Sequence, residues 1–189
     1  MSELVADIAG FAARYDEKDL NGDVIAPGAF AKSLNARTAP VRMLYQHDPQ
    51  TPIGRWTGFR ETPAGLIAEG EILLASMRAR EVHALLSGRA MDGLSIGYRT
   101  VRAKKTAASK GRRIIEADLW EVSIVTFPMA GKARLFRVGP PRAPHDARVA
   151  LPPGAQSPAP PARRASGFPP PDARHFADAL REAASQLSV

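Results

Sequence analysis

The sequence of 189 residues contains no cysteine, which excludes disulfide bonds and thiolate metal sites. Aromatic residues make up only 6% of the chain, so the core has to be built mainly from Ala, Val, Ile and Leu. No apolar run reaches the roughly 18 residues that span a bilayer. No basic segment precedes the first apolar residues, as it would in a secretory signal. These absences predict a soluble, cytosolic protein.

Positive charge is in excess, with 26 basic and 19 acidic residues and a sequence pI near 10.2. Such a balance raises the question of nucleic-acid binding. One basic cluster stands out, between Arg99 and Arg113, and its only aromatic neighbour is Tyr98 at its edge. We expect a solvated hairpin between two strands here, because stacking residues are lacking. Nonspecific attraction to nucleic acid or to an acidic partner is the alternative.

The chain divides into three parts by composition. Residues 1–138 form the expected domain. Residues 139–171 are rich in Pro, Ala and Arg, and 11 of the 17 prolines lie between residues 140 and 171. This composition predicts a disordered linker, because proline cannot donate to helices or sheets and few large apolar groups are present. Residues 172–189 then predict a short amphipathic helix, whose apolar face would hold Phe176, Leu180, Ala183, Ala184 and Leu187.

Residues 1–138 are typical of a mainly β fold with flanking helices (α+β), arranged as a small barrel. Expected strands cover residues 6–12, 41–45, 53–59, 66–74, 94–101 and 113–126. Short helices are expected after Pro27-Gly28 and over residues 76–86. Ser76 is placed to cap the second helix and Gly88 to end it.

His47 is the best placed of the four histidines for catalysis. It follows a β-type run and precedes Asp48-Pro49, where the chain has to leave the strand. An imidazole held at a strand end can act as a general base. His145 and His175 lie in the Pro-rich tail and its helix, which are poor places to hold a catalytic group rigidly. The alternative is that His47 is an ordinary polar loop residue without a catalytic role.

Ser95 lies in Gly93-Leu94-Ser95-Ile96-Gly97, which matches the nucleophile-elbow pattern Gly-x-Ser-x-Gly. The context disagrees with an α/β-hydrolase, because the expected helix precedes Ser95 and β-type residues follow it. The alternative is a small polar residue in a strand whose glycines allow close backbone approach.

Glu121 is a candidate partner for an imidazole. Alternation over residues 119–125 places Leu119, Glu121, Ser123 and Val125 on one face and Trp120 on the other. If the Trp120 face is the core, Glu121 is only a solvent-exposed side chain. If both faces are covered, the carboxylate needs a partner such as an imidazolium. Asp48 is the rival for this role, although sequence neighbours on an extended chain point apart.

Residues from about 10 to 134 resemble the prohead (capsid maturation) proteases of tailed phages and of phage-derived gene transfer agents. The resemblance is carried by several short segments in the family's order: residues 22–30 (GDVIAPGAF), 44–48 (LYQHD), 52–54 (PIG), 65–66 (GL), 93–98 (GLSIGY) and 121–125 (EVSIV). The family usually continues with Pro-Ala-Asn, where this chain has Pro128-Met129-Ala130-Gly131.

The family is similar to the herpesvirus assemblins, which are serine proteases on a small β-barrel with flanking helices. The resemblance implies that Ser95 is the nucleophile and His47 the general base. It implies that Glu121, 26 residues after Ser95, replaces the second histidine of the assemblin triad. Arg134 is the implied support for the oxyanion. No metal and no organic cofactor are implied.

The resemblance also implies a setting. The substrate would be the scaffold-like N-terminal segment of a major capsid protein, and the protease itself, cleaved inside assembling procapsids in the bacterial cytoplasm. A homodimer would follow by analogy with assemblins. The tail would act as a tether inside the shell or be an inert extension.

Two other classes of function compete with a protease. A noncatalytic scaffold or capsid-assembly chaperone would explain the tail and the charge, but it leaves the pairing of His47 with Ser95 as coincidence. A small nucleic-acid-binding barrel fits the pI and is disfavoured by the few aromatic residues.

Overall fold

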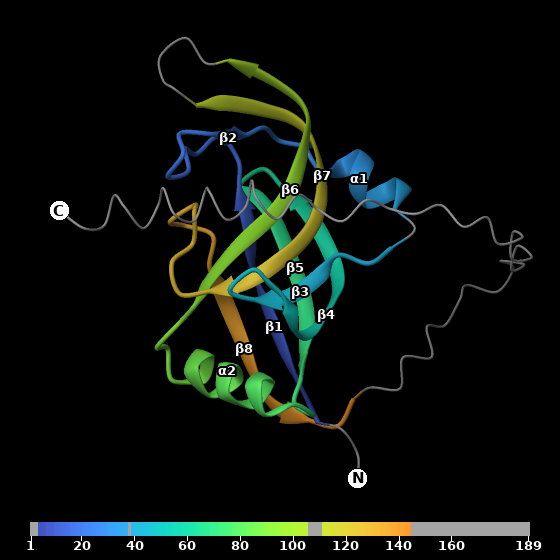
Figure 1. The fold of residues 1–189 in the computed structure, drawn as a ribbon, viewed down its shortest axis with the longest axis vertical. Coiled ribbons are helices and arrows are strands. Elements are labelled where there is room, and N and C mark those ends of the chain that lie inside the picture. The colour runs from blue at the N-terminus through green and yellow to red at the C-terminus, as the bar shows by residue number, and fades with distance from the viewer. Residues whose placement is uncertain (1–3, 38, 106–110, 145–189) are drawn as a thin grey trace, which may run out of the picture. The chain divides into compact units, whose positions relative to one another are not determined.

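The computed structural model describes residues 4–37, 39–105 and 111–144. Its elements, in chain order, are β1 (Val5–Arg14), β2 (Val24–Ile25), α1 (Ala31–Ala36), β3 (Arg42–Tyr45), β4 (Asp48–Thr62), β5 (Gly65–Leu73), α2 (Met77–Ser87), β6 (Gly93–Lys105), β7 (Arg112–Val125) and β8 (Leu135–Arg142). Figure 1 shows the strands as one curved sheet, with α1 and α2 at its margins. The expected mainly β fold with flanking helices is confirmed.

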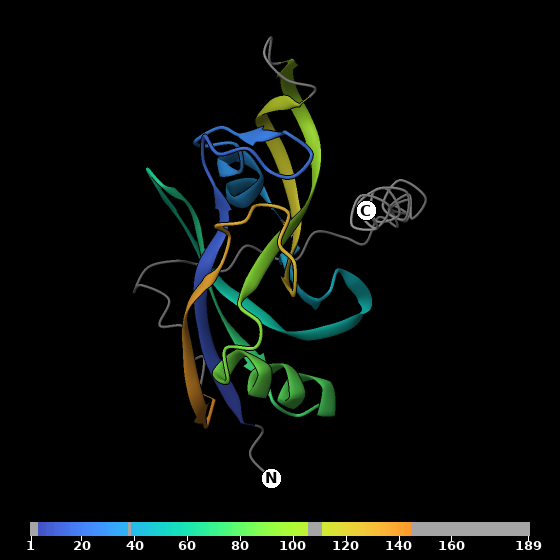
Figure 2. The same ribbon diagram turned by 90° about the vertical axis from the view of Figure 1, so that its left-hand side faces the viewer.

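The sheet is mixed and closes into a small barrel. Its strand order is β2-β7-β3-β4-β5-β1-β8, and β6 pairs with β7. Most neighbours are antiparallel, whereas β2 and β3 run parallel to β7. The start of β6 meets the start of β8, where Gly93 bridges Arg134 and the Leu94 N–H donates to the Ala133 carbonyl at 2.8 Å. Figure 2 shows how far the sheet curls.

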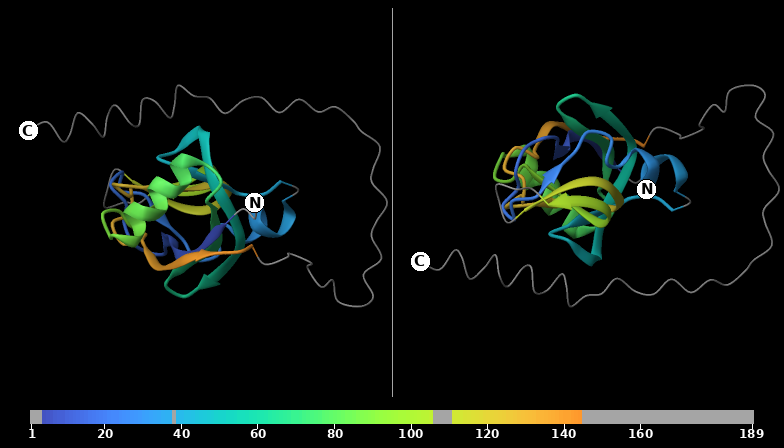
Figure 3. Two further views of the ribbon diagram at one scale, coloured as in Figure 1. Left: turned by 90° about the horizontal axis from the view of Figure 1, so that it is seen from below. Right: turned by 90° about the horizontal axis from the view of Figure 1, so that it is seen from above.

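The barrel is filled by aliphatic side chains, as the shortage of aromatic residues predicts. Its largest fully buried side chains include Phe30, Ile8, Leu66, Ile72, Leu94 and Ile124. Helix α2 lies across one end of the barrel (Figure 3) and buries Ala79, Val82 and Leu86. The Ser76 hydroxyl accepts a hydrogen bond from the Ala79 N–H, so the predicted cap is confirmed. Among the described residues, no helix is long and apolar enough to cross a membrane.

Strand β8 was not predicted, and it carries the fold past residue 138. It runs to Arg142 and includes Pro140 and Pro141. Among the described strands it pairs only with β1. Proline is tolerated on such an edge strand because its missing N–H costs no ladder bond on the open side. The part of the linker after residue 144 and the helix expected over residues 172–189 lie outside the described residues.

Candidate active site

His47 lies in a two-residue hairpin turn between β3 and β4. Tyr45 and Asp48 are paired across this turn, and the two residues between them, Gln46 and His47, have positive φ values of 53° and 60°. Positive φ at both central residues is the signature of a type I′ turn, which normally uses Asn-Gly. Here neither residue is glycine, so the turn holds His47 in a conformation that few side chains adopt without outside support.

Glu121 is brought to the same place by a β-bulge in β7. In the pairing with β6, Gly97 lies opposite Glu121 and Tyr98 opposite Leu119, which leaves Trp120 as the extra residue. Trp120 is therefore pushed outward and is 41% exposed, whereas Leu119 is fully buried. The predicted alternation is thus wrong for Leu119 and Trp120, because a bulge shifts the phase of a strand by one residue. It is confirmed for Glu121 and Ser123.

The imidazole of His47 and the carboxylate of Glu121 share a short hydrogen bond. Nδ1 of His47 lies 2.5 Å from Oε1 of Glu121, and each side chain is 12% exposed. A carboxylate on Nδ1 fixes the tautomer in which Nδ1 carries the proton and Nε2 can accept one. The arrangement therefore orients His47 as a base.

Ser95 lies on the neighbouring strand, on the far side of β7 from the His47 turn. Ser95 pairs with Ser123 across β6 and β7, while Ser123 pairs with Leu44 across β7 and β3. Because adjacent strands are about 4.8 Å apart, β7 alone separates the strand of Ser95 from β3, which leads into the His47 turn. Ser95 and Glu121 thus lie on neighbouring strands, and the His47 turn lies on the other side of β7. Ser95 itself is 5% exposed.

Ser123 belongs to the same cluster and was missed as a functional candidate. Its hydroxyl donates to Oε2 of Glu121 at 2.5 Å and accepts from the His47 N–H at 3.2 Å. The side chain is fully buried. The signal was available in the sequence, because two-residue alternation already placed Ser123 on the face of Glu121.

Asp48, the rival partner for His47, is occupied by its own turn. Oδ2 of Asp48 accepts from the Thr51 hydroxyl at 2.5 Å, and Oδ1 accepts from the Gln50 N–H at 2.9 Å. These hydrogen bonds hold the pKa of Asp48 below its usual value. Asp48 therefore caps a turn, and the carboxylate that binds His47 is that of Glu121.

Arg134 lies next to the start of β6 but its guanidinium is engaged elsewhere. Nη1 forms an ion pair with Asp92, and Nε donates to the Gly131 carbonyl at 2.8 Å. The backbone of Arg134 bridges Gly93, two residues before Ser95. Arg134 therefore ties the segment before β8 to the strand of Ser95.

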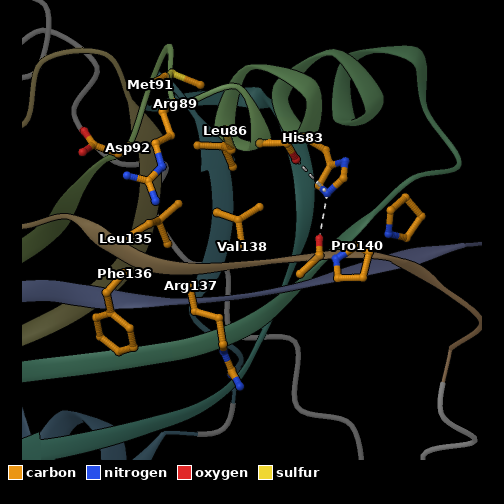
Figure 4. Close-up of a pocket in the computed structure, with 13 residues that line it drawn as sticks. His83, Leu86, Arg89, Met91, Asp92, Leu135, Phe136, Arg137, Val138 and Pro140 are labelled. Carbon is orange, nitrogen blue, oxygen red and sulfur yellow. Dashed lines mark hydrogen bonds between the residues drawn. The ribbon is translucent and has the colours of Figure 1, made fainter.

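A cavity of about 750 Å³ lies between α2 and β8 (Figure 4). Nε2 of His83 lies 2.9 Å from the Gly139 carbonyl oxygen at one side of this cavity. Leu86, Met91 and Val138 supply much of its apolar lining, and the lining includes neither His47, Ser95 nor Glu121. This cavity is therefore separate from the catalytic candidates.

The basic cluster forms a hairpin of β6 and β7 that projects from the barrel (Figure 1). Four of its arginines face carboxylates in the described part of the chain: Arg99 with Asp118, Arg102 with Glu116, Arg112 with Asp23, and Arg113 with Asp16. Much of the positive charge is thus balanced within the fold. This favours the predicted solvated hairpin over a nucleic-acid-binding surface.

Across the described residues, no group of three or more His, Asp or Glu side chains could hold a metal ion.

Comparison with known proteins places this arrangement in context. Residues 2–137 match the family described as the caudovirus prohead serine proteases. The prohead protease of Enterobacteria phage HK97 is 31% identical over 122 residues, covering 63% of this chain and 54% of the relative. That of Escherichia phage T5 is 35% identical over 129 residues, covering 67% of this chain and 60% of the relative. The chain thus spans little more than half the length of these relatives.

Solved structures of herpesvirus proteases show a distant likeness. The KSHV protease in complex with a hexapeptide phosphonate inhibitor is 16% identical, with a TM-score of 0.45 over 69% of this chain and 64% of the other. The varicella-zoster virus protease is 14% identical, with a TM-score of 0.46 over 71% of this chain and 64% of the other. Likeness at this level carries no argument about chemistry.

Proposed function

Because this chain belongs to the caudovirus prohead serine proteases, we propose that it is a serine endopeptidase that matures capsids. Ser95 is the nucleophile, His47 the general base and Glu121 the acid that orients His47. One observation carries the proposal: Nδ1 of His47 lies 2.5 Å from Oε1 of Glu121, one strand away from Ser95. Both side chains are only 12% exposed, so the carboxylate and the imidazole are paired with each other and largely shielded from water.

The proposed reaction proceeds through an acyl-enzyme. The Ser95 hydroxyl oxygen attacks the peptide carbonyl carbon, and Nε2 of His47 takes the hydroxyl proton. His47 then returns that proton to the leaving amine as the C–N bond breaks, which leaves an ester on Ser95. Water, deprotonated by His47, then attacks the ester carbonyl; the C–O bond to Ser95 breaks, His47 returns the proton to the Ser95 oxygen, and the acid is released. The Glu121 carboxylate stabilises the imidazolium during both steps.

The oxyanion needs hydrogen-bond donors beside Ser95. We propose that backbone amides supply them and that Arg134 supports this region. Its guanidinium is held by Asp92, so its contribution comes through the segment that it anchors against Gly93. No metal and no organic cofactor take part in these steps.

The proposed substrate is the scaffold-like N-terminal segment of a major capsid protein, with cleavage of the protease itself as a second event. The reaction would take place inside assembling procapsids in the bacterial cytoplasm. Membership of a prohead protease family supports this setting over a noncatalytic scaffold or chaperone. A homodimer remains a prediction by analogy.

Intact-mass measurement of the major capsid protein tests the proposal. The capsid protein is co-expressed with the full chain, with Ser95→Ala or with Ser87→Ala, a matched serine variant on α2. We expect loss of an N-terminal capsid segment with the wild type and Ser87→Ala, and an untrimmed capsid with Ser95→Ala. Identical trimming by the wild type and Ser95→Ala would point to a host protease. An untrimmed but assembled shell in every case would favour the scaffold function.

A further inference from the structure

We infer that Ser123 is a positioning residue that fixes both the general base and its acid in place. The inference rests on the proposed function, since it concerns how His47 and Glu121 are held ready to activate Ser95. A single hydroxyl touches both partners: it donates to Glu121 and accepts from the His47 backbone.

The hydroxyl completes the hydrogen bonding of the Glu121 carboxylate. Oε1 of Glu121 is 2.5 Å from Nδ1 of His47, and Oε2 receives the Ser123 hydroxyl proton across 2.5 Å. With a donor on each oxygen, the carboxylate cannot rotate about its χ3 torsion without breaking a charge-assisted hydrogen bond. Ser123 thus sets the plane of the carboxylate and, through it, the orientation of the imidazole.

The same hydroxyl supports the turn that carries His47. The turn places two non-glycine residues, Gln46 and His47, at positive φ, a conformation that persists only where surrounding contacts enforce it. The His47 N–H is one such contact, because it donates to the Ser123 oxygen at 3.2 Å. Ser123 therefore holds the backbone of His47, while Glu121 holds its imidazole ring.

Because Ser123 is fully buried, its hydrogen bonds to Glu121 and to the His47 backbone contribute more than they would at a surface. Ser123 has no exposed surface, so bulk water cannot readily take over its hydrogen bonds when the hydroxyl is removed. In such an environment charge-assisted hydrogen bonds are stronger than at a surface, and a buried donor left without an acceptor lowers the stability of the fold. Loss of the hydroxyl would leave one carboxylate oxygen and the His47 N–H without this partner.

Ser33 of helix α1 provides a matched control, because its hydroxyl contacts the same strand, β7. Its hydroxyl donates to Asp118 at 3.1 Å and accepts from the Leu119 N–H at 3.0 Å, so it also joins a carboxylate to a backbone amide. Neither Asp118 nor Leu119 belongs to the proposed triad. A purely structural serine at position 123 should behave as Ser33 does when it is replaced by alanine.

The test measures the rate at which a fluorophosphonate labels Ser95 in the full chain. This probe reacts with the activated serine and needs no knowledge of the cleavage site. We expect Ser123→Ala to label roughly 10- to 100-fold more slowly than the wild type, the loss expected for a hydrogen bond to a charged group. Ser33→Ala should label at the wild-type rate per folded molecule. Ser123→Cys, which keeps the volume but donates weakly, should also label slowly.

The outcomes separate the two proposals. Labelling of the wild type but not of Ser95→Ala supports the proposed nucleophile. If the wild type fails to label, the proposed function fails, and the role of Ser123 fails with it. If the wild type labels and Ser123→Ala and Ser123→Cys match it per folded molecule, only the inference about Ser123 is overturned. An equal loss of rate in Ser123→Ala and Ser33→Ala would also overturn it, because the effect would then be structural.

With capsid protein as substrate, the loss in Ser123→Ala should appear in kcat with KM nearly unchanged.

Discussion

The carboxylate of Glu121 occupies space that is open only because residue 97 is glycine. A β-carbon at Gly97 would lie 2.4 Å from Oε1 of Glu121, and Oε1 is the oxygen that binds His47. Close backbone approach is the alternative explanation that the sequence offers for the glycines around Ser95. At Gly97, the group that lies close to the glycine backbone is the Glu121 side chain of the proposed triad.

Replacing Gly97 by alanine should therefore impair catalysis more than folding. The added methyl group would push Glu121 away from His47, and a displacement of about 1 Å in a catalytic group can cost roughly 100-fold in rate. We expect Gly97→Ala to label with fluorophosphonate at least about 10-fold more slowly than the wild type. Gly58→Ala is the control, because a β-carbon there meets nothing within 4 Å. Equal labelling rates in the two variants would contradict this role of Gly97.

Glu121→Gln should reduce activity strongly while leaving the shape of the site unchanged. The amide cannot stabilise an imidazolium, and its NH2 group can turn toward Nδ1 and favour the wrong tautomer of His47. The corresponding change in serine proteases lowers kcat by about 10⁴-fold. We expect a loss of about 10³- to 10⁴-fold in capsid trimming. Asp48→Asn, at the carboxylate next to His47 in sequence, should trim at close to the wild-type rate. A larger effect of Asp48→Asn than of Glu121→Gln would reverse the assignment.

Replacing Arg134 and replacing Asp92 should have the same effect on the rate at which Ser95 is labelled. If Arg134 supports the oxyanion region through the segment that it anchors, removing either partner of the ion pair loosens the same contact. We expect Arg134→Ala and Asp92→Asn each to slow labelling of Ser95 by several-fold, about 3- to 10-fold, and the double variant to be no slower than either. If Arg134→Ala is slow and Asp92→Asn is unchanged, the guanidinium itself contributes directly.

The sequence predicted most of the barrel because its strands and α2 carry local signals. Period-two alternation, turn residues and the Ser76 cap all depend on neighbours in the chain. Two features do not. The bulge at Trp120 depends on the register between β6 and β7, which no local pattern specifies. Strand β8 contains Pro140 and Pro141, and composition alone assigns them to a linker, because only an edge position makes prolines acceptable in a sheet.

The candidate site was partly predictable for the same reason. Ser95, His47 and Glu121 were named from chain position and from resemblance to prohead proteases. The choice between Glu121 and Asp48 required the fold, since it depends on which carboxylate crosses from β7 to the β3–β4 turn. Ser123 was predictable only as a residue on the correct face. Its contact with the His47 backbone arises from parallel pairing of β3 with β7, which is a long-range property.

The pH dependence of stability should be set in part by Glu71, near the end of β5. Glu71 is 7% exposed and accepts hydrogen bonds from Arg55 and Arg142. Burial acts to raise the pKa of Glu71, but the two arginines outweigh it, and the pKa is lowered overall. A lowered pKa in the folded state means that the stabilisation is complete above the unfolded-state value of about 4.3. It is lost as the pH falls through the folded-state value.

Glu71→Gln should therefore be less stable than the wild type at pH 7 and approach it in acid. Arg55 is half exposed, so solvent screening limits the expected loss to about 1–2 kcal/mol at pH 7. Urea unfolding at pH 7 and at about pH 3 measures the difference in the free energy of unfolding. The control is Glu81→Gln, which removes an exposed ion pair with Arg78 and should change stability by less than about 0.5 kcal/mol. A Glu71→Gln deficit that is the same at both pH values would mean that lost packing, rather than lost charge pairing, accounts for the destabilisation.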